Sequence, residues 1–360
     1  MINTFINLFF DILKIRRKPR VLQMPITSRC NSRCKTCNIW KLPRQIDINP
    51  ARLSLALNDN FFSEVKSVGV NGGEPSLVKN LNEIIEVILN LKKIKYIHLI
   101  SNGLLPHKLL QILKESHQQC KNKNVKLGFT LSVDGVNEIH ESVRGVPNSF
   151  KKIEFLLDEF KNNSHHYCDT FIIGCTISKY NIPYIRDIES FLADYNFPVD
   201  YHIAVPNKRI HTFNDYSYSL LSDERSRLLA TEYFYGKYLS ETKYMEKFKY
   251  FSSYYFLKNR GHKRLMSCPY HYQDVTIDEE LNLSLCATAS DFLGNLNEEN
   301  ATSIRKRGEL KRMAKKLCNS CNECIHYKNP PSIFGGVIFF YEHIKRKLDW
   351  STKFKYLVKW

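Results

Sequence analysis

Three cysteines lie close together near the start of the chain, where Cys30, Cys34 and Cys37 follow the pattern CxxxCxxC. Thiolates are soft, anionic donors that suit zinc and iron–sulfur clusters. A structural zinc ion takes four ligands, normally as two pairs, but the next cysteine here is Cys120. Three thiolates on a cubane cluster leave one iron free to bind something else. The pattern therefore favours an iron–sulfur cluster over a zinc site or unrelated surface cysteines.

The elements that must position these cysteines are visible as short apolar runs that alternate with longer amphipathic runs up to about Pro206. The runs 81–93 and 149–163 place apolar residues on one face at helical spacing. Six strand-then-helix units predict an α/β fold with a parallel sheet, too few for a closed eight-stranded barrel and compatible with a partial (β/α)6 TIM-like barrel. The expected strands are 21–27, 65–71, 95–101, 125–133, 170–177 and 200–205.

Unusual polar groups follow the first four of these strands. The cysteine loop follows the first, "NGGEP" (71–75) ends the second, "SNG" (101–103) the third and "SVDG" (132–135) the fourth. In barrel-like α/β folds the carboxyl ends of the strands meet at one mouth, where the chemistry takes place. We therefore expect the four motifs to lie around one site.

The charge and composition of the chain limit where it works and what it binds. The 360 residues carry a net charge of +17, which favours anionic partners or a solvated basic surface. No apolar stretch is long enough for a transmembrane helix, and residues 1–20 make a poor signal peptide. We therefore expect a cytoplasmic protein, whose clustered cysteines are metal ligands or catalytic groups rather than disulfides. The absence of a recognisable nucleic-acid module makes nucleic acid an unlikely partner.

The cysteine motif and its position resemble the radical S-adenosylmethionine (radical SAM) enzymes. The resemblance implies that Cys30, Cys34 and Cys37 hold a 4Fe–4S cluster, and that the amino and carboxylate groups of SAM chelate its free iron. One electron then cleaves SAM to methionine and a 5′-deoxyadenosyl radical, which abstracts a hydrogen atom from the substrate. Many members have an aromatic residue before the third cysteine, where this chain has Thr36. Trp40 is a hypothetical substitute.

The other rim motifs also resemble this family. "NGGEP" is similar to the segment that holds the SAM amino group, "SNG" to a segment near the methionyl moiety, and "SVDGVNEIHESVRG" to one near the ribose and carboxylate. Each motif also has an ordinary interpretation, as a strand-to-helix turn, a capped helix start or a surface ion pair. The SAM contacts that the resemblance implies are Gly72, Gly73, Glu74, Asn102, Ser132, Asp134 and Arg144.

A second group of cysteines lies near the end of the chain. Two of them flank a predicted hairpin with a turn near Glu280, and a basic helix then leads to "CNSCNEC". This arrangement resembles the auxiliary-cluster extension called SPASM or, in its short form, twitch. It implies one further 4Fe–4S cluster with four ligands and one spare cysteine, whereas a structural zinc site stays open as an alternative. Leu281 stands where the family usually has glycine. The ligand candidates are Cys268, Cys286, Cys318, Cys321 and Cys324.

Three further cysteines, Cys120, Cys168 and Cys175, are expected to be ordinary buried or helix-surface residues. The chain as a whole divides into five predicted parts. These are a basic amphipathic segment (1–20), the radical SAM partial barrel (21–206), a Tyr-rich helical linker (207–260), the SPASM/twitch-like region (261–328) and a basic aromatic tail (329–360). The two end segments either lie on an anionic membrane or pack against the barrel.

The reaction class follows from the two clusters that the resemblance implies. An auxiliary cluster that accepts an electron from a substrate radical makes the net reaction an oxidation. The first hypothesis is an oxidoreductase for a small or lipid-linked, sugar-like molecule, with flavodoxin or ferredoxin as electron donor. The alternatives are a peptide or protein maturase, disfavoured because no room for a leader-binding module precedes Val21, and a non-enzymatic iron–sulfur regulator. The sequence identifies no acid or base; His202 faces the mouth if the strand register is right.

Overall fold

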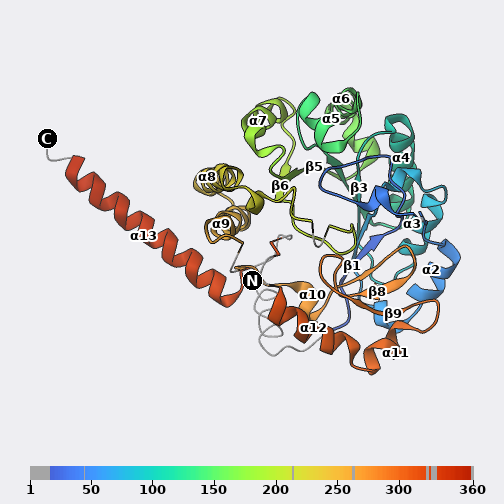
Figure 1. The fold of residues 1–360 in the computed structure, drawn as a ribbon. Helices are drawn as coiled ribbons and strands as arrows, with labels where there is room; N and C mark the ends of the chain where they lie inside the picture. The colour runs from blue at the N-terminus through green and yellow to red at the C-terminus, as the bar shows by residue number, and fades with distance from the viewer. Residues whose placement is uncertain are drawn as a thin grey trace.

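The computed structural model describes residues 17–43, 45–212, 215–261, 264–321, 324–325 and 331–357 (Figure 1). Most of the predicted N-terminal segment 1–20 and part of the predicted tail lie outside the described residues. Nine strands form one sheet in the order β6-β5-β4-β3-β2-β1-β7-β8-β9. The first six strands are parallel neighbours. They are β1 (Val21–Pro25), β2 (Ser67–Asn71), β3 (Tyr96–Ser101), β4 (Lys126–Ser132), β5 (Thr170–Ile177) and β6 (Val199–Ile203).

The six predicted strands are thus confirmed, and the helices between them cover the outer side of the curved sheet (Figure 1). The apolar faces face inward as the spacing predicts. Ile84, Ile85 and Ile88 of α3 are fully buried, and so are Ile153 and Leu156 of α6. The partial barrel therefore has a continuous core between sheet and helices. These helices are α2 (Pro50–Leu57), α3 (Leu81–Leu89), α4 (Pro106–Asn122), α5 (Glu138–Arg144), α6 (Ser149–Tyr167) and α7 (Ile185–Ala193).

The region that carries the second group of cysteines extends the same sheet. Strand β7 (Val275–Ile277) pairs with β1 in parallel, and β8 (Asn282–Ser284) and β9 (Phe292–Asn295) follow as antiparallel strands. The predicted hairpin is therefore present, with Leu281 in its turn at φ +66°. Leu281 adopts the left-handed conformation that glycine adopts without strain, and its side chain is 2% exposed. Burial of the leucine side chain offsets the strain of this turn.

The Tyr-rich segment forms two helices that pack against each other, α8 (Glu224–Ser240) and α9 (Tyr244–Lys258). Phe234, Phe248 and Phe251 are buried between them and their neighbours, whereas Tyr235 and Tyr244 are partly exposed. The remaining helices are α10 (Pro269–Tyr272), α11 (Ala301–Lys306), α12 (Glu309–Ser320) and α13 (Ile333–Leu357). None of the helices in the described part of the chain is long and apolar enough to cross a membrane.

Candidate active site

A cavity of about 240 Å³ opens at the carboxyl ends of the parallel strands. Cys30, Cys34 and Cys37, from the loop after β1, form part of its wall. Residues at or just after the ends of β2, β3, β4, β5 and β6 complete it, so motifs far apart in the sequence meet at one place. Seven residues were predicted from the sequence to contact SAM, and these contacts stay a prediction. All seven residues line this cavity: Gly72, Gly73, Glu74, Asn102, Ser132, Asp134 and Arg144.

The two glycines after β2 let this loop approach the cysteine loop closely. A Cβ atom on Gly73 would lie 2.0 Å from the carbonyl oxygen of Arg29, a distance that no side chain can occupy. The Gly73 amide donates to the carbonyl of Thr27 at 2.7 Å, and the Glu74 amide donates to the carbonyl of Arg29 at 2.8 Å. The loops after β1 and β2 are therefore joined backbone to backbone, which fixes the start of the cysteine loop.

The carboxylate of Glu74 is fully buried and joins two segments of the chain. One of its oxygens accepts hydrogen bonds from the Ser101 hydroxyl at 2.7 Å and the Ser76 amide at 3.0 Å. The other accepts from the Asn102 amide at 2.8 Å. These bonds fix the loop after β3 to the loop after β2, so Glu74 organises the cavity wall in addition to facing the cavity.

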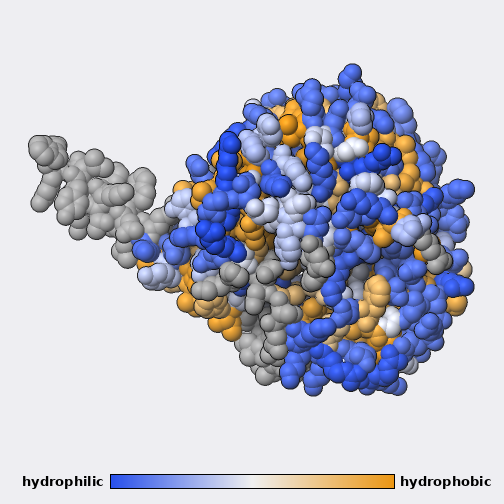
Figure 2. All heavy atoms as spheres, viewed as in Figure 1, coloured by the Kyte–Doolittle hydropathy of each residue, from blue (hydrophilic) through white to orange (hydrophobic). Residues whose placement is uncertain are grey.

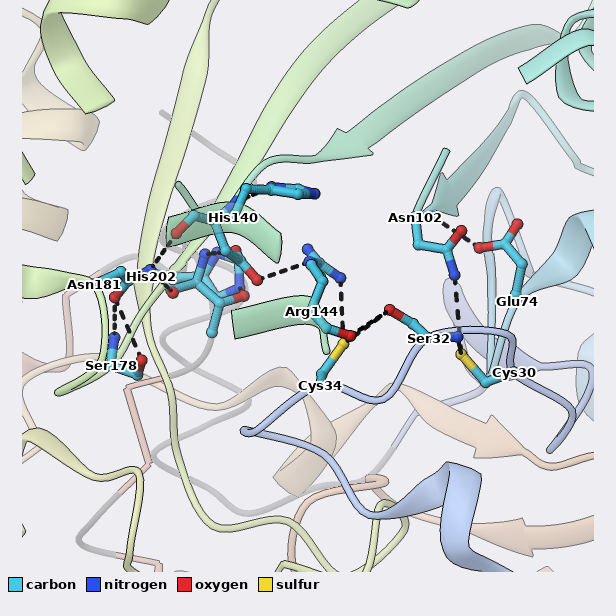
Figure 3. A network of polar contacts seen from close by, with 12 residues as sticks. Cys30, Ser32, Cys34, Glu74, Asn102, His140, Arg144, Ser178, Asn181 and His202 are labelled. Carbon is cyan, nitrogen blue, oxygen red and sulfur yellow. Dashed lines mark hydrogen bonds and ion pairs between the residues drawn. The ribbon is translucent and has the colours of Figure 1, made fainter. Parts of the chain in front are cut away.

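The side chain of Asn102 lies between Glu74 and the cysteine loop (Figure 3). Its Nδ2 atom donates to Oδ1 of Asn31 at 2.9 Å and lies 3.9 Å from the sulfur of Cys30. Its Oδ1 atom accepts from the Leu104 amide at 3.0 Å. The amide orientation is therefore determined by bonds at both ends, and an N–H group points toward the first cysteine.

Arg144 lies near Cys34, away from Asn102 and Glu74 (Figure 3), and forms an ion pair with Asp134. The Arg144 Nε atom lies 3.0 Å from Oδ2 of Asp134, and the side chains are only 12% and 3% exposed. This pair is therefore buried, not at the surface. Arg144 also points its Nη1 atom at the sulfur of Cys34, 3.8 Å away. Burial lowers the pKa of Arg144, but Asp134 and Cys34 raise it more, so the guanidinium stays charged.

Burial keeps two of the three thiols protonated in the metal-free protein. It raises the pKa of Cys30 to about 12 and that of Cys37 to about 11. A metal group that binds these sulfurs must displace their protons, as metal binding to thiols generally does. Asn102 faces the sulfur of Cys30 and Arg144 faces that of Cys34, and both donors suit sulfurs that become thiolates.

Sequence reasoning placed some residues of this cavity wrongly or missed them. Thr36 itself lines the cavity, whereas Trp40 is not part of the wall and donates from its indole to the Cys37 carbonyl at 2.8 Å. His202 does line the cavity, and its Nε2 atom lies 2.9 Å from the Thr176 hydroxyl. Thr176 and Asn207 were not predicted. Their positions at the ends of β5 and β6 follow the same strand-end rule as the other motifs.

Comparison with known proteins agrees with this geometry. Residues 24–192 match the family described as the radical SAM superfamily. Residues 24–192 therefore form a radical SAM domain. One curated relative is a GTP 3′,8-cyclase of Aquifex aeolicus, 30% identical over 141 residues, which are 33% of this chain and 44% of the relative. The chain spans about half the length of the curated relatives it matches.

Solved structures with the same fold cover more of the chain. Native anSMEcpe with bound AdoMet and Kp18Cys peptide has a TM-score of 0.62 at 17% identity and covers 93% of this chain and 99% of its own. Streptococcus suis SuiB bound to precursor peptide SuiA has a TM-score of 0.54 at 15% identity and covers 84% of this chain and 68% of its own. The likeness extends beyond the parallel strands and therefore includes part of the C-terminal region.

The donor set at the mouth fits the cluster of a radical SAM enzyme. Three thiols share one wall, and an amide and a guanidinium face two of them. Among the described residues, no three His, Cys, Asp or Glu side chains converge closely enough to hold a single metal ion. In a cluster, unlike at a single ion, the cysteine sulfurs need not converge on one metal.

Four of the five C-terminal cysteines surround a second, very small cavity of about 10 Å³. Cys268, Cys286, Cys321 and Cys324 line it together with Arg264. Burial raises the pKa of Cys286 to about 11 and that of Cys321 to about 12. The guanidinium of Arg264 donates to the carbonyls of Met266 and Ser267 at 2.9 Å each. The group therefore combines four sulfurs with one buried positive charge.

The fifth cysteine, Cys318, points elsewhere. Its sulfur lies 3.2 Å from Nδ1 of His271, and it does not line the small cavity. Cys318 lies in the last turn of α12, whereas Cys321 follows the end of this helix at Ser320. Sequence spacing alone could not separate them.

One turn connects the two groups of cysteines. The amide of Asn38, next to Cys37, donates to the carbonyl of Ile210 at 3.0 Å, and its side chain donates to the carbonyl of His211 at 3.1 Å. On the other side, the Lys208 amide donates to the carbonyl of Thr288 at 2.9 Å. We refer to residues 207–212 as the bridging turn. It contacts the segment after Cys37 and the segment after Cys286 at the same time.

Proposed function

We propose that this radical SAM enzyme is an oxidoreductase that removes a hydrogen atom from a small, hydroxylated, sugar-like substrate, free or lipid-linked. The observation that carries the proposal is the second group of four cysteines, which the bridging turn connects to the first. A second cluster there gives a substrate radical an electron acceptor close by, so that the net reaction is a two-electron oxidation.

At the first site, Cys30, Cys34 and Cys37 would hold a 4Fe–4S cluster, and SAM would bind beside it in the same cavity. When bound, this cluster supplies the electron that splits SAM into methionine and the 5′-deoxyadenosyl radical. Around it, the buried Arg144 guanidinium offers a positive charge to a carboxylate. The loops fixed by Glu74 keep SAM in one orientation, which limits the side reactions of a free radical.

At the second site, Cys268, Cys286, Cys321 and Cys324 are the proposed ligands of a second 4Fe–4S cluster, which when bound accepts one electron. Arg264 stabilises the negative charge of four thiolates there.

The atoms and electrons of an alcohol oxidation then balance. A carbon-bound hydrogen atom goes to the 5′-deoxyadenosyl radical, which becomes 5′-deoxyadenosine, one electron would go to the proposed second cluster, and the hydroxyl proton goes to a base. His202 is the candidate base, because it lines the cavity and burial lowers its pKa, which keeps the imidazole neutral.

The second candidate function is maturation of a peptide or protein. Its support is that two solved structures of the same fold were determined with peptides bound. Their identity to this chain is 17% or less, so the support is for the fold and not for the substrate.

The deciding experiment is anaerobic. Reconstituted protein is mixed with SAM and a reductant, which is dithionite, flavodoxin or ferredoxin. The 5′-deoxyadenosine formed is then quantified without any extract and after addition of a soluble, a lipid or a peptide extract. We expect a lipid or soluble extract to raise the yield, with a product lighter by two hydrogens, and Cys30→Ala to abolish it. A rise only with the peptide extract would support maturation instead. No 5′-deoxyadenosine in any mixture, with iron present, would disprove the catalytic proposal.

A further inference from the structure

The last helix of the structure, α13, carries an unusual surface. Six apolar side chains, 40 to 65% exposed, follow the helical repeat along its first three turns. We call them the apolar stripe. Isolated exposed apolar residues are common on protein surfaces, but a continuous stripe marks an interaction site. The stripe consists of Ile333, Phe334, Val337, Phe340, Tyr341 and Ile344.

The opposite side of the same helix is what attaches it to the enzyme. Phe339 is 5% exposed and packs against rings of α8 and α9, 5.4 Å from Phe248 and 5.2 Å from Phe251 between ring centroids. The Ser332 amide and hydroxyl both donate to the carbonyl of Leu265, at 2.9 and 2.8 Å. The start of α13 is therefore fixed to the body by one face, and the apolar stripe cannot pack there.

The direction of the helix leaves the stripe accessible. Figure 1 shows α13 running away from the body, and Figure 2 shows hydrophobic residues gathered where it leaves. The sequence around the stripe is basic, since residues 331–360 contain six Lys or Arg and two acidic residues. Lys345 is exposed directly after the stripe. An apolar, aromatic-rich face combined with an excess of basic residues is the composition of helices that lie in a membrane interface.

We propose that α13 docks this enzyme on an anionic lipid surface. The stripe inserts Phe334, Phe340 and their neighbours among the acyl chains at the headgroup boundary, and the basic residues pair with anionic headgroups. The charge balance favours this occupant over an apolar protein groove or a second copy of α13, because two copies would bring the excess of basic residues together. This proposal does not depend on which substrate the active site oxidises.

The test is flotation of the full-length holoenzyme with vesicles, either phosphatidylglycerol and phosphatidylcholine in equal parts or phosphatidylcholine alone. We expect binding to the anionic vesicles, weaker binding to the neutral ones, and loss of anionic binding at high salt. Phe340→Glu should lower binding about tenfold or more. The matched control is Phe292→Glu on β9, because Phe292 is 64% exposed and Phe340 65%. This control should bind like the wild type.

Circular dichroism and iron content confirm that both variants are folded. Absence of wild-type flotation, or equal loss in Phe340→Glu and Phe292→Glu, overturns the proposal. Light scattering tests the competing occupant. A wild-type dimer that Phe340→Glu converts to a monomer, without vesicle binding in either form, would assign the stripe to self-association.

Discussion

At the scale of single residues, the cavity depends on charged groups that are buried and fully engaged. Glu74 accepts three hydrogen bonds with no exposed surface, and Arg144 is held between Asp134 and Cys34. Such groups stabilise a fold only while every partner is present, because an orphaned buried polar group costs its full desolvation free energy. Conservative substitutions are therefore informative here.

Glu74→Gln retains the shape of the side chain but replaces one acceptor oxygen with a donor. The new NH2 group would then face an N–H or O–H donor of Ser76, Ser101 or Asn102, so at least one of the present hydrogen bonds would be lost. We expect a loss of about 1–3 kcal/mol in the free energy of unfolding, together with weaker SAM binding. Anaerobic denaturant unfolding and a SAM titration measure the two effects. Glu64→Gln, at the exposed pair with Lys93, is the control and should change neither. Unchanged stability in Glu74→Gln would contradict the assigned role.

The different directions of Cys318 and Cys321 predict different iron contents. Cys321→Ala removes a proposed ligand and should lower the iron content by about half of the cluster complement. Cys318→Ala removes only a neighbour of His271 and should keep the iron content of the wild type. Iron and sulfide analysis of the anaerobic proteins, with Mössbauer spectra, distinguishes the two variants. Equal iron loss in both would mean that Cys318 is a ligand after all.

At the scale of elements, the site is built from loops at the ends of strands, and the loops are held together by backbone contacts. The loops after β1 and β2 touch at Gly73, where only hydrogen fits. The strands themselves are ordinary buried parallel strands. Their role is to bring the loops to one rim, where the loops line the cavity together with the last residues of β2 and β3, Asn71, Ile100 and Ser101.

Two glycine-to-alanine substitutions should have opposite effects. Gly73→Ala places a methyl group against the Arg29 carbonyl, so we expect a loss of about 1–3 kcal/mol in stability and impaired cluster loading. Gly236→Ala, in the middle of α8, meets nothing within 4 Å and should stabilise the protein by roughly 0.5–1 kcal/mol. Thermal unfolding under anaerobic conditions measures both. A neutral Gly73→Ala would show that the two loops can separate without cost.

Periodicity and strand-end position were enough to predict the six parallel strands, the cysteine loop and the convergence of the motifs. They could not reveal contacts between segments far apart in sequence. The pairing of β7 with β1, the direction of Cys318 and the contacts of the bridging turn depend on tertiary packing, which leaves no local pattern. The turn at Leu281 also depends on tertiary packing. Leucine disfavours the left-handed backbone conformation found there, and burial of its side chain offsets this cost.

At the scale of the whole molecule, buried neutral histidines make stability depend on pH. Burial lowers the pKa of His98 to about 4 and that of His140 to about 3. Each binds a proton more readily in the unfolded chain, where its pKa is near 6.5. Their contribution to stability is therefore complete above about pH 6.5 and is lost progressively as the pH falls toward the folded-state values.

We expect the free energy of unfolding to fall by about 1 kcal/mol for each of these histidines between pH 7.5 and 5.5. His98→Gln should make this dependence shallower, whereas His107→Gln, at an exposed position, should leave the slope unchanged. Denaturant unfolding at several pH values provides the measurement. An identical slope in wild type and His98→Gln would contradict the assignment to buried neutral histidines.

The bridging turn has a consequence for how the enzyme is made in the cell. Because residues 207–212 bond to the segment after Cys37 and to the segment after Cys286, order in one cysteine loop supports order in the other. Cells short of iron should therefore accumulate a mixture of empty and complete enzyme, with few half-assembled molecules.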